Sequence, residues 1–287
     1  MQIHPQAIEL VTELIKLALK EDVREGDHTS LATLPEGLKG RMKLLVKQEG
    51  ILCGTGFAAR VIQAVDPEIQ METLLSDGAE VQPGDIAFYL EGPQISLLTA
   101  ERTLLNGMQR MSGIASYTHK LAKTIADTRC VLLDTRKTAP GMRIMEKWAV
   151  KTGGGYNHRM GLYDQILIKD NHVDFAGGIA KAISKVHDYL QKKGLNLFIE
   201  IETRNFDEID QVLDCGGVQR ILIDNFTPEQ VARAVEKIGH RFETEASGGI
   251  NEQNLREYAL TGVDFISMGA LTHQVRSMDL SLKVCSN

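Results

Sequence analysis

The second half of the 287-residue chain contains six short runs rich in β-branched and other apolar residues, most of them ending on polar side chains. Segments with the apolar spacing of amphipathic helices separate most of these runs. Strands that alternate with helices in this way form βαβ units, whose strands lie parallel in one sheet. The runs are residues 130–135, 165–170, 197–203, 220–225, 242–247 and 264–269.

The number of these units limits the folds that are open to the chain. Six or seven units are too few for a complete eight-stranded barrel. We therefore expect an α/β fold with an incomplete α/β barrel of about six to seven parallel strands. An open, doubly wound sheet is the alternative. We place the barrel domain at residues 113–272.

The first part of the sequence predicts a separate N-terminal domain at residues 1–112, which the C-terminal segment 273–287 joins. Turn signals separate three β-like runs, which indicates an antiparallel sheet with helices packed on it. Gly107 and Gly113 are expected to break or bend a long helix. The expected strands cover about residues 41–48, 69–75 and 86–92, and the expected helices about residues 5–22, 56–65 and 95–126.

Charge and apolar patterning exclude several classes of protein. The formal net charge is -6, whereas a protein that binds duplex DNA normally carries a basic surplus. No apolar run approaches the ~20 residues needed to cross a bilayer, and the N-terminal residues form an amphipathic pattern rather than a signal peptide. Four widely spaced cysteines indicate reduced thiols, with no metal cluster and no disulfide framework. We therefore expect a cytoplasmic protein that binds neither nucleic acid nor membranes.

Polar residues at the C-terminal ends of the expected strands indicate where a site would form, because α/β barrels build their sites at that end. Their character changes along the chain: the early ends are cationic, the middle ends are acidic, and the late ends are small and rich in glycine. The sequence therefore predicts three neighbouring sub-sites on one rim of the barrel.

The late strand ends suit an anion. The segment Ser247-Gly248-Gly249 precedes an expected helix, and Gly269-Ala270 precedes the last segment of the chain. Backbone N–H groups at helix starts bind phosphate, and a phosphate at the last two strands recurs among barrels. The alternative is that these glycines serve only tight turns between a strand and a helix.

The middle strand ends carry carboxylates that suit Mg²⁺ or sugar hydroxyls. Glu202 and Asp224 follow buried runs on neighbouring strands and would face one pocket. Capping of the following turn is an equal alternative for Asp224. Glu200 lies two residues before Glu202 and points to the same side of the strand, so either glutamate could be the one that faces the site.

Basic residues cluster between positions 136 and 169 of this acidic chain, and such a local positive field attracts anionic substrates. Lys169 ends an apolar run, where an unpaired lysine would be costly to bury. The glycines at 153–155 are expected to end the preceding helix and to direct His158 and Arg159 toward the mouth of the site. A solvated helix face is the expected place of Arg143, Lys147 and Lys151.

The stretch "LLDTRKTAPGMRIMEKWAVKTGGGYNHRMGLYDQILIKDNH" (residues 132–172) closely resembles the signature of the quinolinate phosphoribosyltransferase family, also called nicotinate-nucleotide pyrophosphorylase (carboxylating). The blocks "EDVREGDHTS", "ERTLLNGMQRMSGIAS", "IEIET", "ILIDNF" and "EASGGI" resemble other blocks of the family in the same order. The resemblance therefore covers essentially the whole chain. Tyr156 is a small departure, at a position where the family varies.

The resemblance implies a reaction and an architecture. The family transfers the phosphoribosyl group of phosphoribosyl pyrophosphate to quinolinate with decarboxylation. The products are nicotinate mononucleotide, pyrophosphate and CO₂, a step of NAD biosynthesis. The resemblance further implies Mg²⁺ as cofactor, an N-terminal α/β sandwich on the incomplete barrel, and a homodimer or a dimer-based hexamer.

The resemblance also implies roles for individual residues, by position in this chain. Quinolinate or a neighbouring phosphate would be held by Arg102 of the neighbouring subunit, Thr135, Arg136, Lys137, His158, Arg159 and Lys169. The ribose hydroxyls and Mg²⁺ would be held by Glu202 and Asp224. The 5′-phosphate would be held by Ser247, Gly248, Gly249, Ser267, Gly269 and Ala270. The implied catalytic residues are Lys137, Lys169, Glu202 and Asp224, and either lysine could steer the leaving carboxylate or reprotonate the ring.

Two other functions compete with this one. A paralogue of the same fold is associated with molybdate-transport operons and often lacks parts of the cationic block, which is intact here. A non-catalytic binding protein that kept the fold would have no need for a complete set of charged strand ends. Detection of nicotinate mononucleotide as a product separates the three.

Overall fold

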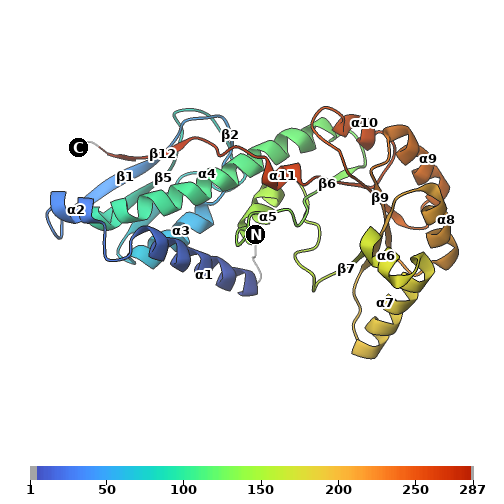
Figure 1. Cartoon of the computed structure of the whole chain (residues 1–287). Helices are drawn as coiled ribbons and strands as arrows, with labels where there is room; N and C mark the ends of the chain where they lie inside the picture. The colour runs from blue at the N-terminus through green and yellow to red at the C-terminus, as the bar shows by residue number, and fades with distance from the viewer. Residues whose placement is uncertain (1–4, 286–287) are drawn as a thin grey trace. The chain divides into compact units, whose positions relative to one another are not determined.

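The computed structural model of the chain describes residues 5–285, and Figure 1 shows its course. The chain divides into two compact units. The first unit comprises the chain up to His119, residues 138–154 and the chain from Leu271 onward, and the second comprises residues 120–137 and 155–270. The domain boundaries expected at 112/113 and 272/273 stay a prediction. No helix within residues 5–285 is both long enough and apolar enough to span a membrane.

An antiparallel sheet of four strands forms the centre of the first unit. Its spatial order is β12 (Leu280–Val284), β1 (Lys39–Val46), β5 (Ile86–Pro93) and β3 (Gln70–Thr73). In β1, Met42, Leu44 and Val46 are buried and alternate with more exposed residues, so one face of this strand packs in the core. The antiparallel sheet expected in this part of the chain is confirmed. A short pair, β2 (Gly50–Ile51) and β4 (Glu80–Val81), stands apart from it.

The helices of the first unit include the three that were expected at about residues 5–22, 56–65 and 95–126, and residues 28–33 form one that was not expected. They are α1 (Pro5–Asp22), α2 (His28–Thr33), α3 (Thr55–Val65), α4 (Gln94–Thr124) and α5 (Arg143–Thr152). The prediction of a solvated face on α5 is wrong for Lys147, which is only 1% exposed. Its neighbours Glu146 and Ala149 are buried as well, because α5 packs inside the unit on more than one face.

Helix α4 is one continuous helix of 31 residues, so the prediction that glycine breaks it is wrong. The two glycines instead allow close packing. A Cβ atom at Gly107 would collide with the ring of Phe57, and a Cβ atom at Gly113 would collide with the carbonyl oxygen of Arg276. Tertiary contacts around the helix thus outweigh the weak helix propensity of glycine.

We expect the substitution Gly113→Ala to destabilise the protein by about 2 kcal/mol. The gain in helix propensity is about 1 kcal/mol, whereas overpacking against a backbone carbonyl that cannot rotate away costs about 3 kcal/mol. Urea unfolding measures the difference. Asn106→Ala, at an exposed position of the same helix, is the control and should not lower stability. Equal stability of Gly113→Ala and the wild type would contradict the close approach.

Six parallel strands form the sheet of the second unit. Their spatial order is β6 (Val131–Leu133), β11 (Phe265–Ser267), β10 (Glu243–Ser247), β9 (Arg220–Asp224), β8 (Ile199–Thr203) and β7 (Ile166–Ile168). Within this sheet, β6, the first strand in sequence, pairs with β11, the last. Strands β6 and β7 are the two edges and do not pair with each other. A doubly wound sheet would reverse its order in the middle. The incomplete barrel is therefore confirmed, and the open-sheet alternative is not.

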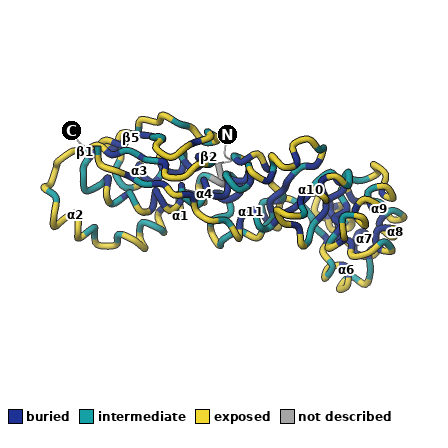
Figure 2. The backbone as a smooth tube through the Cα atoms, turned by 90° about the horizontal axis from the view of Figure 1, so that it is seen from above, coloured by how far each residue is buried: buried dark blue, intermediate teal, exposed yellow. Residues whose placement is uncertain are grey.

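Helices cover the outer side of this sheet, as Figure 1 shows for α7, α8 and α9. The helices are α6 (Asp170–Ala176), α7 (Ile179–Lys193), α8 (Phe206–Cys215), α9 (Pro228–Ile238) and α10 (Leu255–Ala259), and the short α11 (Ala270–His273) follows β11. In Figure 2 the buried parts of the second unit lie inside and the exposed parts outside. In α9, for example, Val231, Ala234 and Ile238 are buried at helical spacing.

The strands alternate between an outer apolar face and an inner polar one. In β8, Ile199 and Ile201 lie on one face, and Glu200 and Glu202 lie on the other. All four residues are buried, so this barrel encloses carboxylates as well as apolar side chains. The inner face leads up to the carboxyl ends of the strands, where the site lies.

Candidate active site

A cavity of about 610 Å³ opens at the carboxyl ends of the strands of the second unit. In the register of the parallel strands, Glu202 on β8 pairs with Leu222 on β9, and Asp224 on β9 pairs with Ser247 on β10. The inner side chains of neighbouring strands therefore end near the same edge of the sheet. The predicted site residues that line this cavity are Thr135, Arg136, Lys137, His158, Arg159, Lys169, Glu202, Asp224, Ser247, Gly248, Gly249 and Ser267. The cationic, acidic and glycine-rich strand ends therefore share one opening.

Three of the predicted residues lie elsewhere. Arg102 is on α4 in the first unit, beside a groove of about 220 Å³ that Thr103 and Met142 also line. Gly269 and Ala270 follow β11 and are not among the described residues that line the cavity of the second unit. The roles of these three residues stay predictions.

The cationic wall of the cavity combines a buried arginine with exposed lysines. Arg159 is 9% exposed, and its Nη1 donates to the carbonyl oxygen of Gln165 at 3.4 Å. Burial, together with repulsion by Arg136, lowers the pKa of Arg159. The Nε of Arg136 is buried and has no hydrogen-bond partner among the described residues. Crowded positive charge and a free buried donor both favour binding of an anion here.

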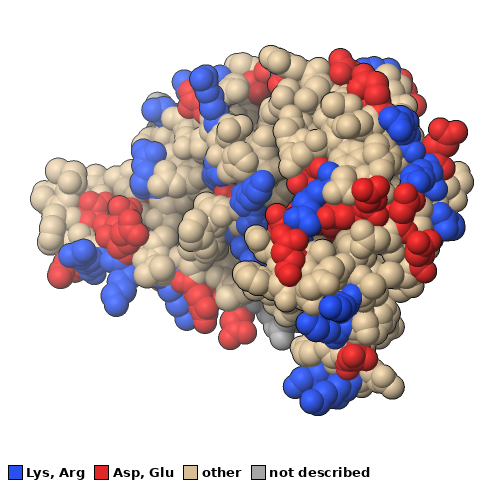
Figure 3. Space-filling view, turned by 45° about the vertical axis from the view of Figure 1, so that its right-hand side comes forward, with Lys and Arg blue, Asp and Glu red and all other residues tan. Residues whose placement is uncertain are grey.

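The acidic wall is formed by Glu202 and Asp224. Burial and the negative charge of Glu202 raise the pKa of Asp224. Lys169 lies between the two walls, with its Nζ 3.3 Å from Oε2 of Glu202. The sequence left Glu200 and Glu202 as alternatives, and the structure separates them: Glu202 lines the cavity, whereas Glu200 is fully buried and does not line it. In the view of Figure 3, basic and acidic side chains lie side by side near the middle of the molecular face.

The glycine-rich strand end differs in part from its prediction. Gly248 and Gly249 adopt positive φ angles of 91° and 67°, and a Cβ at Gly248 would collide with Asn225. Helix α10 begins only at Leu255 and has five residues, so its N-terminus does not lie at these glycines. The expectation that the glycines begin a helix is wrong. Any anion at this end would meet the backbone of the loop, since glycine allows close approach.

The loop that carries His158 and Arg159 is anchored to β6. Gly153 caps α5, so the prediction that the glycine triplet ends this helix is confirmed. Beyond it, the backbone N–H of His158 donates to Oδ1 of Asp134 at 2.9 Å, and Nδ2 of Asn157 donates to Oδ2 of Asp134 at 2.6 Å. Asp134 is fully buried. Asp134 lies in the expected strand run 130–135, and no sequence pattern indicated this role for it.

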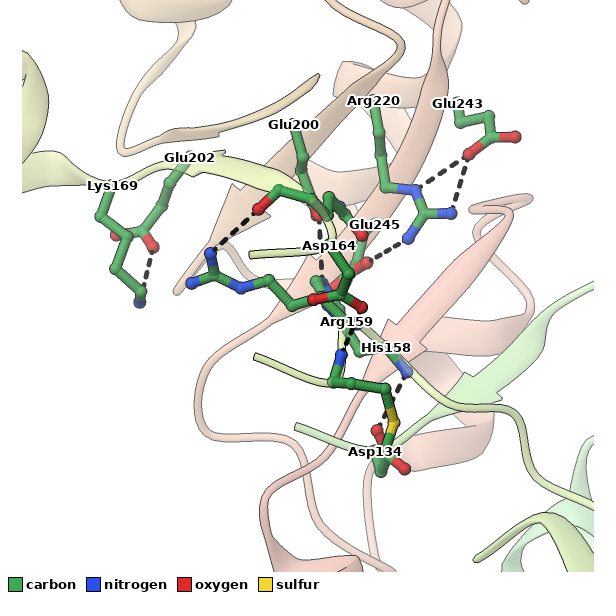
Figure 4. A network of polar contacts seen from close by, with 12 residues as sticks. Asp134, His158, Arg159, Asp164, Lys169, Glu200, Glu202, Arg220, Glu243 and Glu245 are labelled. Carbon is green, nitrogen blue, oxygen red and sulfur yellow. Dashed lines mark hydrogen bonds and ion pairs between the residues drawn. The ribbon is translucent and has the colours of Figure 1, made fainter. Parts of the chain in front are cut away.

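Both ring nitrogens of His158 bond within the protein. The backbone N–H of Arg159 donates to Nδ1 at 2.7 Å, so the proton is on Nε2, which lies 3.1 Å from Oε2 of Glu200. The same Nε2 lies 3.6 Å from Oε1 of Glu245. His158 thus links the cavity wall to two carboxylates inside the barrel, as Figure 4 shows.

The two buried carboxylates, Glu200 and Glu245, are an unexpected feature of the barrel interior. Burial and the charge of Glu200 raise the pKa of Glu245 to about 7, and burial also raises the pKa of Glu200. Together with His158 they have the spacing of a metal site. However, Gln165 already donates to Glu200 at 2.7 Å, and Arg220 to Glu245 at 2.8 Å. The opposite charge of Arg220 thus takes the place that a cation would have.

The raised pKa of Glu245 predicts a pH-dependent stability. Between about pH 4.5 and 7 the folded protein holds a proton that the unfolded chain has lost, so the free energy of unfolding falls as the pH rises through this range. Glu245→Gln removes this titration. The decrease in the free energy of unfolding between pH 5 and pH 8 should therefore become smaller by up to about 3 kcal/mol. Urea unfolding at pH 5 and pH 8 measures the change.

Glu243→Gln is the matched control for that experiment, because Glu243 lies on the same strand, also pairs with Arg220 and is 46% exposed. It should leave the difference between pH 5 and pH 8 as in the wild type. An unchanged difference in Glu245→Gln would show that Glu245 is not protonated in the folded state near pH 6.

Comparison with known proteins places this chain in a family. The models for the quinolinate phosphoribosyl transferase N-terminal and C-terminal domains match residues 27–112 and 114–283. The chain is 43% identical over 286 residues to the chloroplastic nicotinate-nucleotide pyrophosphorylase (carboxylating) of Arabidopsis thaliana, covering 94% of this chain and 82% of that protein. It is 38% identical over 264 residues to the probable nicotinate-nucleotide pyrophosphorylase (carboxylating) of Bacillus subtilis (strain 168), covering 92% and 90%.

A solved structure agrees with these matches. The nicotinate-nucleotide pyrophosphorylase of Francisella tularensis superimposes with a TM-score of 0.91 at 42% sequence identity, over 96% of each chain. The likeness thus extends over nearly the whole chain. The chain belongs to the quinolinate phosphoribosyl transferase family.

Proposed function

We infer that this chain is a decarboxylating quinolinate phosphoribosyltransferase, which converts quinolinate and phosphoribosyl pyrophosphate into nicotinate mononucleotide, pyrophosphate and CO₂ in NAD biosynthesis. The observation that carries the inference is the single cavity, in which a cationic wall faces two carboxylates and a glycine-rich loop. A dianionic base and a sugar phosphate need these complementary surfaces side by side. The family match over nearly the whole chain supports the same reaction.

Quinolinate would bind at the cationic wall. Its two carboxylates match the guanidinium groups of Arg136 and Arg159 and the ammonium groups of Lys137 and Lys169, with Thr135 beside them. The unpartnered Nε of Arg136 supports this assignment, because a carboxylate would complete its bonding. His158 contributes by holding the backbone of Arg159, since both of its ring nitrogens are already bonded.

Phosphoribosyl pyrophosphate would lie across the acidic wall and the glycine loop. Glu202 and Asp224 would face the ribose, and the backbone of Ser247, Gly248 and Gly249 would hold the 5′-phosphate, with Ser267 beside it. Gly269 and Ala270, which follow β11, would complete its surroundings. The two carboxylates also fit Mg²⁺, which prefers oxygen ligands and keeps substrate phosphates and water as partners. Burial, and after it repulsion by Glu202, raises the pKa of Asp224, and a bound cation would relieve that repulsion. When bound, Mg²⁺ neutralises charge on the departing pyrophosphate.

The reaction needs positioning and charge, and no nucleophilic side chain. The pyridine nitrogen of quinolinate attacks C1 of the ribose as the bond to pyrophosphate breaks. Positive charge develops at C1, and the carboxylates of Glu202 and Asp224 stabilise it. The ring nitrogen then carries a positive charge, so the adjacent carboxylate leaves as CO₂ and its electron pair stays at C2. A proton completes the product there, and Lys137 and Lys169 are the two ammonium groups close enough to the wall to donate it.

The site would be completed by a second subunit. We propose a homodimer, or a hexamer built from dimers, in which Arg102 of one subunit reaches the cationic wall of the other. Arg102 is exposed on α4 and belongs to the first unit, so it is free to meet a partner. The enzyme would be cytoplasmic.

The reaction itself is the first test. Purified protein with quinolinate, phosphoribosyl pyrophosphate and Mg²⁺ should form nicotinate mononucleotide and release CO₂ in equal amounts, and a chelator should stop both. Folded protein that forms no product removes this function. Binding of quinolinate without turnover would favour the non-catalytic binding protein, and turnover of a different base would favour the paralogue.

A further inference from the structure

A row of buried contacts runs from the interior of the barrel to the cationic wall. Arg220 lies on β9 at the inner end, with its Nη1 2.8 Å from Oε2 of Glu245. Oε1 of Glu245 lies 3.6 Å from Nε2 of His158, whose other ring nitrogen accepts from the backbone of Arg159. Figure 4 labels these four side chains. The row thus connects a buried cation to the arginine that faces the substrate.

Arg220 is held in one place. Its Nε and Nη2 donate to Oε2 of Glu243 at 3.0 and 2.8 Å. Its guanidinium carbon lies 3.9 Å from the ring centroid of Phe265 and 5.3 Å from that of Phe198. Only 12% of its side chain is exposed. A side chain fixed on two sides by carboxylates and by two aromatic rings can serve as an anchor for its neighbours.

Glu245 depends on this anchor. It is fully buried beside Glu200, and its Oε1 has no hydrogen-bond partner among the described residues. Arg220 supplies the positive charge that offsets the repulsion between the two carboxylates. Without Arg220, that repulsion would act on side chains that lie against the ring of His158.

A change at His158 would be passed on to Arg159 through the backbone. The ring accepts the N–H of Arg159 itself, and the N–H of His158 is held by Asp134, so the ring and the loop backbone are coupled on both sides. Arg220 is not among the described residues that line the cavity. Any effect of Arg220 on the substrate must therefore pass through the residues between them.

We propose that Arg220 is a positioning residue for the dicarboxylate half of the site: through Glu245 and His158 it fixes the backbone from which Arg159 meets quinolinate. This proposal rests on the assignment of Arg159 to quinolinate under the proposed function. It predicts a selective effect, because the row of contacts reaches Arg159, whereas the groups assigned to phosphoribosyl pyrophosphate lie at the carboxyl ends of β8, β9, β10 and β11.

Steady-state kinetics of Arg220→Met test the proposal. The KM for quinolinate should rise about 10-fold or more, because a shift of the order of 1 Å in a binding group can cost up to about 100-fold. The KM for phosphoribosyl pyrophosphate should stay within about twofold, since its contacts are unchanged. Arg220→Lys keeps a cation beside Glu245 and should restore most of the loss. Calorimetric titration with quinolinate alone should reproduce the order wild type, Arg220→Lys, Arg220→Met.

Two further variants make the outcome decisive. Ile221→Ala lies next to Arg220 on β9 but faces the opposite, fully buried side, so it destabilises the barrel without touching the row. Its KM for quinolinate should be that of the wild type. The proposal is wrong if Arg220→Met raises the KM for quinolinate and the KM for phosphoribosyl pyrophosphate equally. It is also wrong if Ile221→Ala raises the KM for quinolinate as much as Arg220→Met does, because Arg220 would then only stabilise the barrel. A normal KM for quinolinate in folded Arg220→Met would overturn it as well, and if that variant does not fold, Arg220→Gln takes its place.

Arg159→Ala separates this proposal from the one on which it rests. If Arg159→Ala binds quinolinate normally, the assignment of the cationic wall has failed, and the role of Arg220 fails with it. If Arg159→Ala loses quinolinate binding while Arg220→Met keeps it, only the role of Arg220 is wrong.

Discussion

Alanine at Lys137 or at Arg159 lowers kcat/KM for quinolinate by about 10²- to 10³-fold, as is usual when one charged donor of a site is removed. Quinolinate carries two negative charges, and these two side chains supply positive charge on the wall that we propose as its binding site. Arg159 is also buried beside Arg136, where an anionic ligand relieves the repulsion between them. Initial rates with each substrate varied in turn give the effect, which should appear mainly in the parameters for quinolinate.

Lys120→Ala is the matched control for these variants. Lys120 is also in the second unit, is 60% exposed and pairs with Glu252 at its surface. Its loss should leave the kinetics unchanged. Arg159→Lys separates the contribution of the positive charge from that of the guanidinium geometry, because lysine keeps the charge but lacks the planar pair of donors. Near-normal kinetics in folded Lys137→Ala or Arg159→Ala would disprove the assignment of the cationic wall.

Mixing two inactive proteins tests whether Arg102 acts across a subunit interface. Arg102→Ala alone and Lys169→Ala alone should each be almost inactive. In a mixed dimer, one site combines the intact Lys169 of the first protein with the intact Arg102 of the second. Since half of the dimers are mixed and each has one complete site, activity should return to about a quarter of the wild type at equal concentrations.

The control for this experiment is a mixture of Lys169→Ala with Glu202→Gln, two changes within the same cavity of one subunit. Lys169 contacts Glu202 directly, so no mixed dimer of these two proteins contains a complete site. Exchange of subunits must be followed separately, for example with two affinity tags. Proven exchange without any recovery in the Arg102 mixture would place Arg102 outside the site of the partner.

The sequence was sufficient for the parts of the fold that depend on local pattern. Each of the six expected runs became a strand, because alternation of short apolar runs with amphipathic helices leaves few arrangements for a chain. The same geometry gathers the polar strand ends at one opening, so Lys137, Lys169, Glu202 and Ser247 could be expected to meet there.

The sequence was insufficient where contacts cross the structure. Arg220 and Glu245 are 25 residues apart, and their pairing inside the barrel depends on the register of two strands. The unbroken α4 depends on the atoms packed against Gly113. The late start of α10 depends on a turn in which the N–H of Asn251 donates to Oδ1 of Asn254 at 2.8 Å. None of these contacts leaves a periodic signal in the chain.

The distribution of the binding groups over the strands has a consequence for the redesign of this enzyme. Under the proposed function, the groups for the base lie in the segments after β6 and β7, and those for the sugar phosphate lie at the carboxyl ends of β8, β9, β10 and β11. Exchange of only the two early loops should therefore retarget the catalyst to a different nucleobase-like acceptor while its use of the activated sugar is inherited unchanged. The later strands of the barrel would thus serve the phosphoribosyl donor, and the two early loops could be exchanged to change the acceptor base.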